Sequence, residues 1–290
     1  MKNLYAFKPF AIITLIVLTI LNTNCGKITY SPEVTTSNVG SITATGAVSG
    51  GTIVDDGGAE IIRKGICWNT SPSPTIENNN TNNGEGAEAF TSTLTGLTAG
   101  TTYYVRAYAE NSVGISYGNE LIFTTPLPQI GSSYQGGILA YIFQPGDFGY
   151  VPNAFHGIIS APHDIFDPLY SFWGCSGNSV GSTSGNIGKG KDNTTLILYV
   201  CNSPGVAAYQ CDNYSINGYD DWFLPSLSEL YVLRGNLYLN GNIANFNASD
   251  CYWTSTEVSS VSAYRFCFST GLGSVDTKYI SYRVRPIRYF

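Results

Sequence analysis

Short strand-like segments separated by turn residues fill the stretch from Glu33 to Pro126, and no other feature constrains the fold as strongly. β-Branched and aromatic residues recur in these segments, often alternating with polar ones, and clusters of Gly, Asn and Pro divide them. The segments are VTTSNVGSITATGAVSG, IIRKGICWNT, EAFTSTLTGL, TTYYVRAYAENSVG and ISYGNELIFTT. A half-buried strand packs its apolar face against a second layer, so this pattern predicts a β-sandwich.

The composition agrees with strands and loops rather than with long helices. Only 12% of the residues are charged, there are 21 Tyr and one Met, and helices with paired surface charges are therefore not expected. The 290 residues, 43% of them hydrophobic, suggest about two domains. A formal net charge of −6 and a pI near 4.8 exclude nucleic acid as a partner class, because phosphate binding requires a basic face.

Part of the first stretch resembles the last strands of a fibronectin type III domain. In LTGLTAGTTYYVRAYAENSVGISYG, Leu97, Thr101 and Tyr103 match the L-x-x-x-T-x-Y corner of that family, in which the tyrosine hydroxyl ties the start of a strand to nearby backbone. The resemblance spans most of residues 31–125, and the expected domain is residues 31–126. It implies a fibronectin type III-like sandwich that serves as a spacer or a binding module, and the fold alone assigns no function.

Residues 1–25 are typical of an export signal. Two lysines precede the apolar run from Phe10 to Leu21, which is too short to span a bilayer but suits the core of a signal peptide. Cys25 follows where a bacterial lipoprotein signal places the cysteine that receives lipid, and the alternative is ordinary cleavage nearby. Lipid on Cys25 would tether the chain without a spanning helix. We expect an outer membrane lipoprotein of the cell envelope, on the surface or the periplasmic face.

A second domain is expected at residues 130–290, after a short, fairly rigid linker at Leu127–Gly131, because Pro126 and Pro128 stiffen the exit from the sandwich. It opens with YQGGILAYIF and closes with YISYRVRPIRYF, and both patterns predict strands, so we expect these two end strands to pair. The stretch Asn193–Cys201 is the candidate for a first helix, capped by Asp192 or by Asn193 itself. The whole chain is therefore predicted to be mainly β, with an α+β second domain.

The stretch GYDDWFLPSLSEL predicts a tight approach to a second helix. Ser226 followed by Glu229 fits a capping box, and the leucines after Ser226 fall on one side of a helix. Asp220 and Asp221 are then turn residues that hydrogen-bond local backbone. The alternative is a Ca²⁺ site in which Asp220, Asp221 and Glu257 supply hard oxygen ligands.

Four ordered blocks of the second domain resemble one family of exported proteins. The blocks are WGCSGNSVGSTSGNIGKGKDNTTLILYVC, GYDDWFLPSLSEL, YWTSTEVSSVSAYRFCFSTG and YRVRPIRYF. They are similar to the domain shared by the C-terminal region of the Legionella collagen-like adhesin and the Fibrobacter succinogenes major paralogous domain, also called domain of unknown function 1566. This resemblance implies a C-type-lectin-like fold with two short helices, and it suggests polysaccharide or matrix binding. The family's usual YWSSSE and VRAVR are here YWTSTE and VRPIR.

The cysteines of an exported chain are expected to be oxidised. If CYWTSTE and AYRFCFS form a hairpin that turns near Ser259, Cys251 lies opposite Cys267, and the same register places Trp253 opposite Arg265 and Ser255 opposite Ala263. We therefore predict a Cys251–Cys267 bridge. A second bridge, Cys201–Cys211, would close a short loop, and Cys175 would remain unpaired. Cys67 has no second cysteine in its own domain, so we expect it to be a small buried hydrophobe.

A ligand site is predicted from charge and aromatic residues. Arg283 and Arg285 share strand parity and offer a positive spot to a charged sugar, while Tyr252 and Tyr264 offer rings for stacking. The alternative is that the arginines pair with carboxylates of the same domain. The sequence thus favours a non-catalytic module that binds a glycan or matrix component, without a cofactor. There are two alternatives. One is a structural envelope component that recognises a protein, and the other is an enzyme related to formylglycine generation that uses Cys251 and Cys267.

Overall fold

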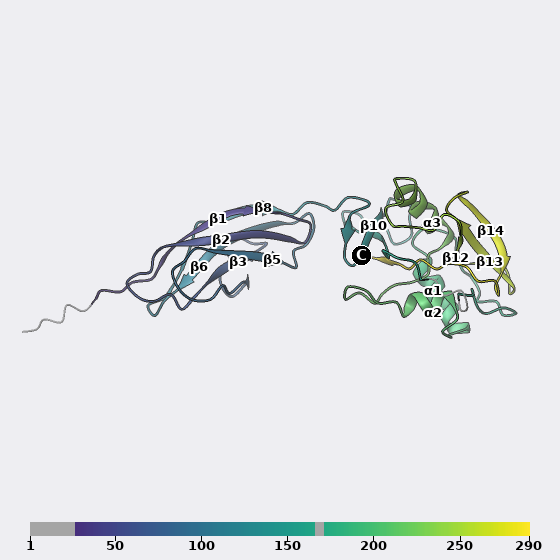
Figure 1. The fold of residues 1–290 in the computed structure, drawn as a ribbon, viewed down its shortest axis with the longest axis horizontal. Coiled ribbons are helices and arrows are strands. Elements are labelled where there is room, and N and C mark those ends of the chain that lie inside the picture. Colours follow the sequence, from purple (N-terminus) through teal and green to yellow (C-terminus); the bar gives the residue numbers. More distant parts are fainter. Residues whose placement is uncertain (1–26, 166–170) are drawn as a thin grey trace, which may run out of the picture. The chain divides into compact units, whose positions relative to one another are not determined.

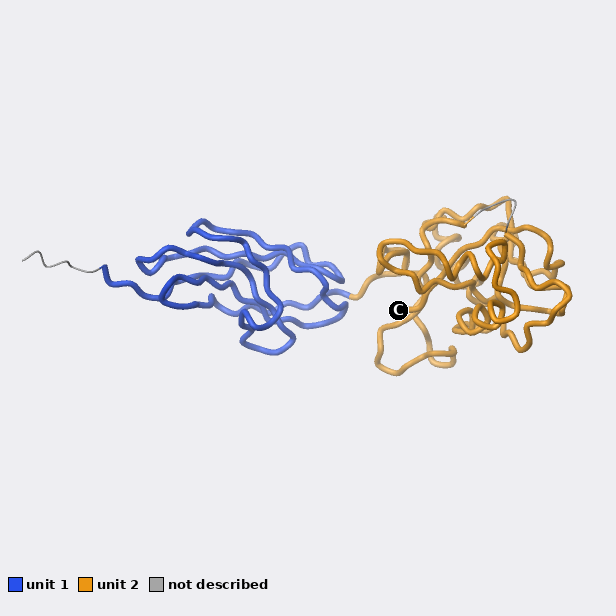
Figure 2. Tube along the Cα trace, turned by 90° about the horizontal axis from the view of Figure 1, so that it is seen from below, with its two compact units in different colours: residues 1–126 blue, residues 127–290 orange. Residues whose placement is uncertain are grey.

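The computed structural model describes residues 27–165 and 171–290. The expected export signal at residues 1–25, with Cys25, lies outside them. The chain divides after Pro126 into two compact units, whose elements are labelled in Figure 1 and which are coloured separately in Figure 2. Among the described residues, no helix has both the length and the apolar character needed to cross a membrane.

The first unit is a sandwich of two antiparallel sheets. One sheet has the order β1-β2-β5 and consists of β1 (Glu33–Gly40), β2 (Gly46–Asp55) and β5 (Phe90–Thr95). The other has the order β4-β3-β6-β7, with β8 also paired to β6, and consists of β3 (Arg63–Asn69), β4 (Asn79–Asn80), β6 (Thr102–Glu110), β7 (Ile115–Tyr117) and β8 (Leu121–Thr124).

An apolar layer fills the space between these sheets. In β6, Tyr103, Val105 and Ala107 are buried in alternation with less buried neighbours, as a strand with one inward face requires. The Tyr103 hydroxyl accepts a hydrogen bond of 2.9 Å from the amide of Thr98, which forms the expected tyrosine corner. Cys67 is fully buried, and burial raises the pKa of its free thiol to about 11. The predicted fibronectin type III-like sandwich is confirmed.

The second unit combines two small sheets with short helices (Figure 1). The first sheet has the order β15-β11-β10-β9, with β9 (Ser133–Tyr134), β10 (Gly137–Ile142), β11 (Gly157–Ser160) and β15 (Ile287–Tyr289). The second has the order β12-β13-β14, with β12 (Cys251–Glu257), β13 (Ser262–Cys267) and β14 (Leu272–Thr277). The helices are α1 (Gly190–Val200), α2 (Ala207–Asp212), α3 (Leu227–Leu233) and the π-helical turn η1 (Arg234–Tyr238).

Two predictions for this unit need correction. The end strands β10 and β15 lie in one sheet but do not pair, because β11 lies between them, and all of its residues are buried. Helix α1 begins at Gly190, three residues before the predicted start, and no side chain caps it. The buried Asn193 does not cap α1, because its amide binds the backbone of Ser184 and the hydroxyl of Ser255. Helix α2 was not predicted.

The capping box at α3 is confirmed. Ser226 is the N-cap residue, its amide donates to Oε2 of Glu229 at 2.7 Å, and its hydroxyl accepts from the amide of Glu229 at 3.4 Å. The same hydroxyl donates to the carbonyl of Asn186 at 2.8 Å, so the cap also holds the loop that precedes α1.

The β12–β13 hairpin has the predicted register only at its open end. Cys251 lies opposite Cys267 and Trp253 opposite Arg265, but Ala263 faces Glu257 instead of Ser255. The residues between leave the ladder because the amide of Ser255 donates to the carbonyl of Pro225 at 2.7 Å. Contact with the start of α3 therefore overrides the regular pairing.

The described residues include two disulfides, and one of them differs from the prediction. Cys251 is bridged to Cys267, the expected partner across the hairpin. Cys201, however, is bridged to Cys175, so the predicted Cys201–Cys211 bridge is wrong. Cys211 belongs to the unpredicted α2, which turns its thiol into the core, where it is fully buried and free. Burial raises the pKa of that thiol well above its ordinary value.

Candidate functional site

The residues predicted to bind a ligand converge on a buried carboxylate. Arg285 has no exposed surface, and its Nε donates to Oδ1 of Asp164 at 2.7 Å. The hydroxyl of Tyr252, also without exposed surface, donates to Oδ2 of Asp164 at 2.7 Å. The surface role predicted for Arg285 and Tyr252 is therefore wrong. A guanidinium that is removed from water needs a paired carboxylate, and Asp164 provides it.

The remaining arginines of the C-terminal segment are also engaged within the unit. Nε of Arg283 donates to Asp250 at 2.7 Å, and its NH1 group lies 3.4 Å from Asp164. The alternative in which these arginines pair with the domain's own carboxylates is thus the arrangement found. Tyr264 in β13 remains partly exposed, while its carbonyl accepts from the hydroxyl of Thr254.

The three acidic residues considered for Ca²⁺ do not form a common site. Asp221 forms a two-point ion pair with Arg288, with Oδ2 and the NH2 group 2.9 Å apart, so its local-turn interpretation is also wrong. Burial disfavours its charge, but the hydrogen bonds and charge of Arg288 outweigh burial, and the pKa of Asp221 is lowered. Asp220 is exposed. Over the two described ranges, no group of three or more His, Cys, Asp and Glu side chains is placed to hold a metal ion.

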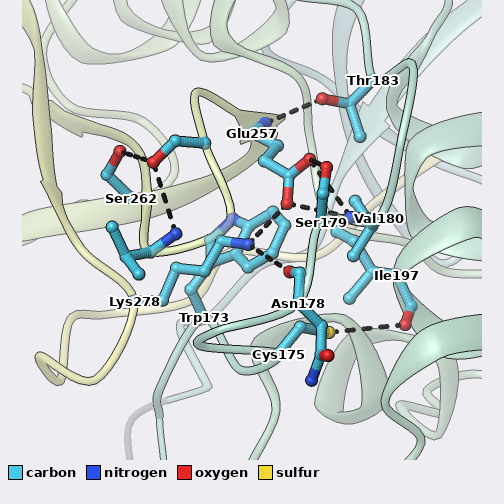
Figure 3. A network of polar contacts seen from close by, with 12 residues as sticks. Trp173, Cys175, Asn178, Ser179, Val180, Thr183, Ile197, Glu257, Ser262 and Lys278 are labelled. Carbon is cyan, nitrogen blue, oxygen red and sulfur yellow. Dashed lines mark hydrogen bonds and ion pairs between the residues drawn. The ribbon is translucent and has the colours of Figure 1, made fainter.

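Glu257 belongs to a different polar network, shown in Figure 3. It accepts hydrogen bonds from the ammonium of the fully buried Lys278 and from the amide of Val180. The Lys278 ammonium also donates to the carbonyl of Asn178 at 3.1 Å and lies 4.4 Å from the ring centroid of Trp173. These contacts fasten the loop before α1 to the end of the hairpin, which is a structural role.

A cleft that the sequence did not predict is a better candidate for a binding site than the predicted arginines and tyrosines. Its volume is about 280 Å³, and it is lined by Gly146, Asp147, Phe148, Asn186, Ile187 and Ser228. These residues come from the loop after β10, from the loop before α1 and from the first turn of α3. Because three separate segments supply them, no single sequence motif signals the cleft.

Close backbone contact joins the two loops of the cleft. Gly188 has φ of +83°, and a Cβ at this position would overlap the carbonyl oxygen of Phe148. Only glycine therefore allows the two loops to lie so close. The ammonium of Lys189 lies 4.4 Å from the ring centroid of Phe148, and it also pairs with Asp192 at 2.9 Å.

A buried carboxylate supports the cleft from beneath. Glu229 has no exposed surface, and it accepts hydrogen bonds from the amides of Gly188 at 2.9 Å and Ser226 at 2.7 Å and from the hydroxyl of Tyr289. Burial raises the pKa of Glu229, while the four donors, which include the amide of Gly190, oppose that rise. Glu229 thus ties the loop before α1 to both α3 and β15.

The side chains that line the cleft suit a neutral polar ligand. Phe148 is 46% exposed, and the side chains of Asn186 and Ser228 have no hydrogen-bond partner among the described residues. Asp147 uses Oδ2 to accept from the hydroxyl of Tyr141 at 2.9 Å and from the amide of Gln144 at 2.8 Å. An exposed ring beside an amide, a hydroxyl and a fixed carboxylate can bind a polyhydroxylated molecule by stacking and hydrogen bonds.

Comparison with known proteins finds similarity to solved structures alone. No family model and no curated protein matches the sequence. A sixth fibronectin type III domain, from human fibronectin type III domain containing protein 3, is 20% identical, covers 36% of this chain and 95% of its own, and has a TM-score of 0.29. The FN3 domain of human collagen XX is 19% identical over 33% of this chain and 94% of its own, with a TM-score of 0.27.

A bacterial structure is similar over a comparable share. The sensor domain of the anti-sigma factor RsgI4 in Pseudobacteroides cellulosolvens is 16% identical over 34% of this chain and 98% of its own, with a TM-score of 0.26. Similarities this distant carry no argument about ligand or activity, so the function rests on the geometry of the chain itself.

Proposed function

We propose that this chain is an exported, lipid-anchored protein of the cell envelope that binds an extracellular polysaccharide or matrix glycan without catalysis. In this proposal the export signal and Cys25 tether the chain to the outer membrane, and the sandwich is a spacer. The second unit, which resembles the adhesin-related C-type-lectin-like family in four sequence blocks, is the binding module.

The observation that carries this proposal is the cleft between Phe148, Asn186 and Ser228. It presents an exposed ring and unpaired hydrogen-bonding groups on a backbone fixed by Gly188 and Glu229. A preorganised site of this kind binds with little loss of conformational entropy. Its mixed polar lining matches the hydroxyl groups and apolar faces of sugars.

A second candidate function is recognition of a protein partner in the envelope. One observation favours it: Leu196, Tyr199 and Val200 form an exposed apolar stripe on α1, and Tyr199 is 91% exposed. These positions are spaced by three and four residues, so they lie on one side of the helix. An enzyme related to formylglycine generation would use Cys251 and Cys267 as thiols, and in this structure they form a disulfide across the hairpin.

A glycan array with the mature, full-length protein tests the proposal. The wild type is expected to bind a subset of glycans, and Phe148→Ala or Asn186→Ala is expected to abolish that signal. Tyr199→Ser is the control, because Tyr199 lies on α1 and not in the cleft; it should bind normally. A blank array for the wild type would overturn the glycan proposal and favour the protein partner. Glycan binding that is lost in Tyr199→Ser and kept in Phe148→Ala would overturn the assignment of the cleft as the binding site.

A further inference from the structure

The two disulfides of the second unit lie in different electrostatic surroundings. The NH1 group of Arg265 is 3.0 Å from the sulfur of Cys251 and 2.8 Å from that of Cys267. The sulfur of Cys175 lies 3.7 Å from the carbonyl oxygen of Ile197. Within the described part of the chain, no Arg or Lys side chain is hydrogen-bonded to the Cys175–Cys201 sulfurs. One bridge therefore faces a cation and the other does not.

Arg265 is held in this position by the neighbouring strand. Its Nε lies 3.2 Å from Oδ2 of Asp276 in β14, and its guanidinium lies 5.3 Å from the ring centroid of Tyr282. The Tyr282 hydroxyl donates to the same carboxylate at 2.6 Å. Because Nε is used by the carboxylate, NH1 remains available to the sulfurs. The contact is thus built into the sheet and does not depend on the S–S bond.

A fixed guanidinium stabilises a thiolate much more than it stabilises a disulfide sulfur. Cations beside a cysteine lower the thiol pKa, and a thiolate of low pKa is a good leaving group in exchange. Cys267 is 8% exposed and lies closest to the guanidinium, whereas Cys251 is more exposed. The accessible sulfur and the stabilised sulfur are therefore different atoms of one bridge.

We propose that Cys251–Cys267 is a reversible thiol–disulfide exchange site that an external dithiol opens, while Cys175–Cys201 is a permanent structural bridge. The thiolate of the dithiol attacks Sγ of Cys251, the Cys251–Cys267 bond breaks, and Cys267 leaves as a thiolate held by Arg265. The second thiol of the reductant then attacks the mixed disulfide and releases Cys251. Two electrons pass from the dithiol, which becomes a disulfide, and both cysteines end reduced.

The hairpin keeps other contacts when this bridge opens. The carbonyl of Cys251 accepts from the amide of Arg283 at 3.1 Å, and the amide of Trp253 donates to the carbonyl of Arg283 at 2.9 Å. β13 also remains paired to β14 along its length. Reduction is therefore a local event that exposes two thiols on a folded domain.

The first experiment compares both bridges in the wild-type, full-length protein. The protein is equilibrated with increasing dithiothreitol at neutral pH, free thiols are alkylated, and mass spectrometry of the peptides identifies each labelled cysteine. We expect Cys251 and Cys267 to be labelled at a dithiothreitol concentration about tenfold lower than Cys175 and Cys201. The buried thiol of Cys211 is the internal control and should stay unlabelled while the unit is folded. Simultaneous opening of both bridges, or labelling of Cys211 together with Cys251, would overturn the proposal.

The second experiment tests the part played by Arg265. Arg265→Gln is expected to raise the dithiothreitol concentration that opens Cys251–Cys267 about tenfold, and Arg265→Lys is expected to restore most of the wild-type value. An unchanged concentration in Arg265→Gln would overturn the role of the guanidinium. Should Arg265→Gln fail to fold, the pH dependence of Cys267 alkylation in the reduced wild type decides: the rate should titrate below the ordinary thiol pKa of about 8.5, and titration at or above that value would contradict the proposal.

Discussion

In the sandwich, apolar side chains between two sheets form the core, whereas in residues 127–290 buried charges join distant parts of the chain. Leu94 and Ile66 have no exposed surface in the first unit, where the Arg63–Glu110 pair is partly exposed. In the second unit, Arg285 and Lys278 are fully buried, and each is paired with a carboxylate. The second unit, whose sheets have four and three strands, thus adds directional contacts between buried charges to its own apolar clusters, and such contacts are costly to break one partner at a time.

The strongest test of this difference between the two units is the removal of the Asp164 carboxylate. In Asp164→Ala, Arg285 stays buried without a counter-charge, and we expect a loss of about 3–5 kcal/mol from the free energy of unfolding. Hydrogen exchange should show the loss of protection in β12 and β15. The control is Glu110→Ala, which removes the partner of the partly exposed Arg63 and should cost at most about 1 kcal/mol. Equal losses in both variants would contradict the distinction between the units.

Leu94→Ala tests the apolar half of the comparison. It removes a fully buried side chain of β5, and the cavity should cost about 2–5 kcal/mol. The loss is measured by urea unfolding, together with reduced amide protection in β2 and β5. Val54→Ala, at an exposed position of β2, is the control and should cost far less. A cost below that of the exposed control would show that the sandwich core is not the main source of its stability.

The difference between local contacts and contacts between distant residues explains which features could be predicted from the sequence. The tyrosine corner of Tyr103, the Ser226–Glu229 cap and the Cys251–Cys267 pair depend on residues close in sequence or on strand alternation, and each is present. Asp164 and Arg285 are 121 residues apart, so no local pattern joins them. The cleft likewise needs three loops brought together by the fold. The Cys201–Cys211 prediction rests on a short loop between the two cysteines, but helix α2 lies in that stretch and buries Cys211, and no strong periodic pattern in the sequence signals this helix.

Acid should weaken the second unit through its paired carboxylates. Burial opposes the ionisation of Asp221 and Glu257, yet Arg288 and Lys278 outweigh it, and both pKa values are lowered from 3.8 and 4.5. The unfolded chain then binds protons more readily than the folded one. The stability that these two carboxylates contribute is therefore present above their ordinary pKa values and is lost as the pH falls through their lowered pKa values in the folded state. Burial raises the pKa of Glu229 from 4.5, so its contribution to stability has the opposite pH dependence: it is present at low pH and is lost as the pH rises through the pKa of the folded state.

Thermal melts through this acidic range, followed by tryptophan fluorescence and hydrogen exchange, measure the effect. Glu257→Gln is the matched variant, since it removes one titrating group and should flatten the acid limb of the second unit. A pH profile that is the same in Glu257→Gln and in the wild type would contradict the assignment.

Ser226→Ala tests the cap that links α3 to the cleft loop. It removes the acceptor for the Glu229 amide and the donor to the carbonyl of Asn186, and we expect a cost of about 0.5–2 kcal/mol. Ser226→Thr retains the hydroxyl and should recover most of the loss. Thermal denaturation measures both, and an unchanged melting temperature in Ser226→Ala would mean that the cap contributes little.

The smallest effect is expected at Asp221, where the ion-pair and calcium interpretations differ. Its side chain is 40% exposed, so loss of the pair with Arg288 in Asp221→Asn should cost about 0.2–1 kcal/mol, because solvent screens a partly exposed pair. Asp220→Asn is the matched control, since Asp220 is exposed and should tolerate the change.

Calcium or EDTA should shift none of the melts. If Asp221 were a calcium ligand, saturating Ca²⁺ would stabilise the wild type by about 2.7 kcal/mol at one hundred times the dissociation constant, and Asp221→Asn would abolish the gain. Arg288 already occupies both oxygens of Asp221, so a calcium-dependent shift lost in Asp221→Asn would require this ion pair to open and would make the module a calcium-dependent lectin candidate.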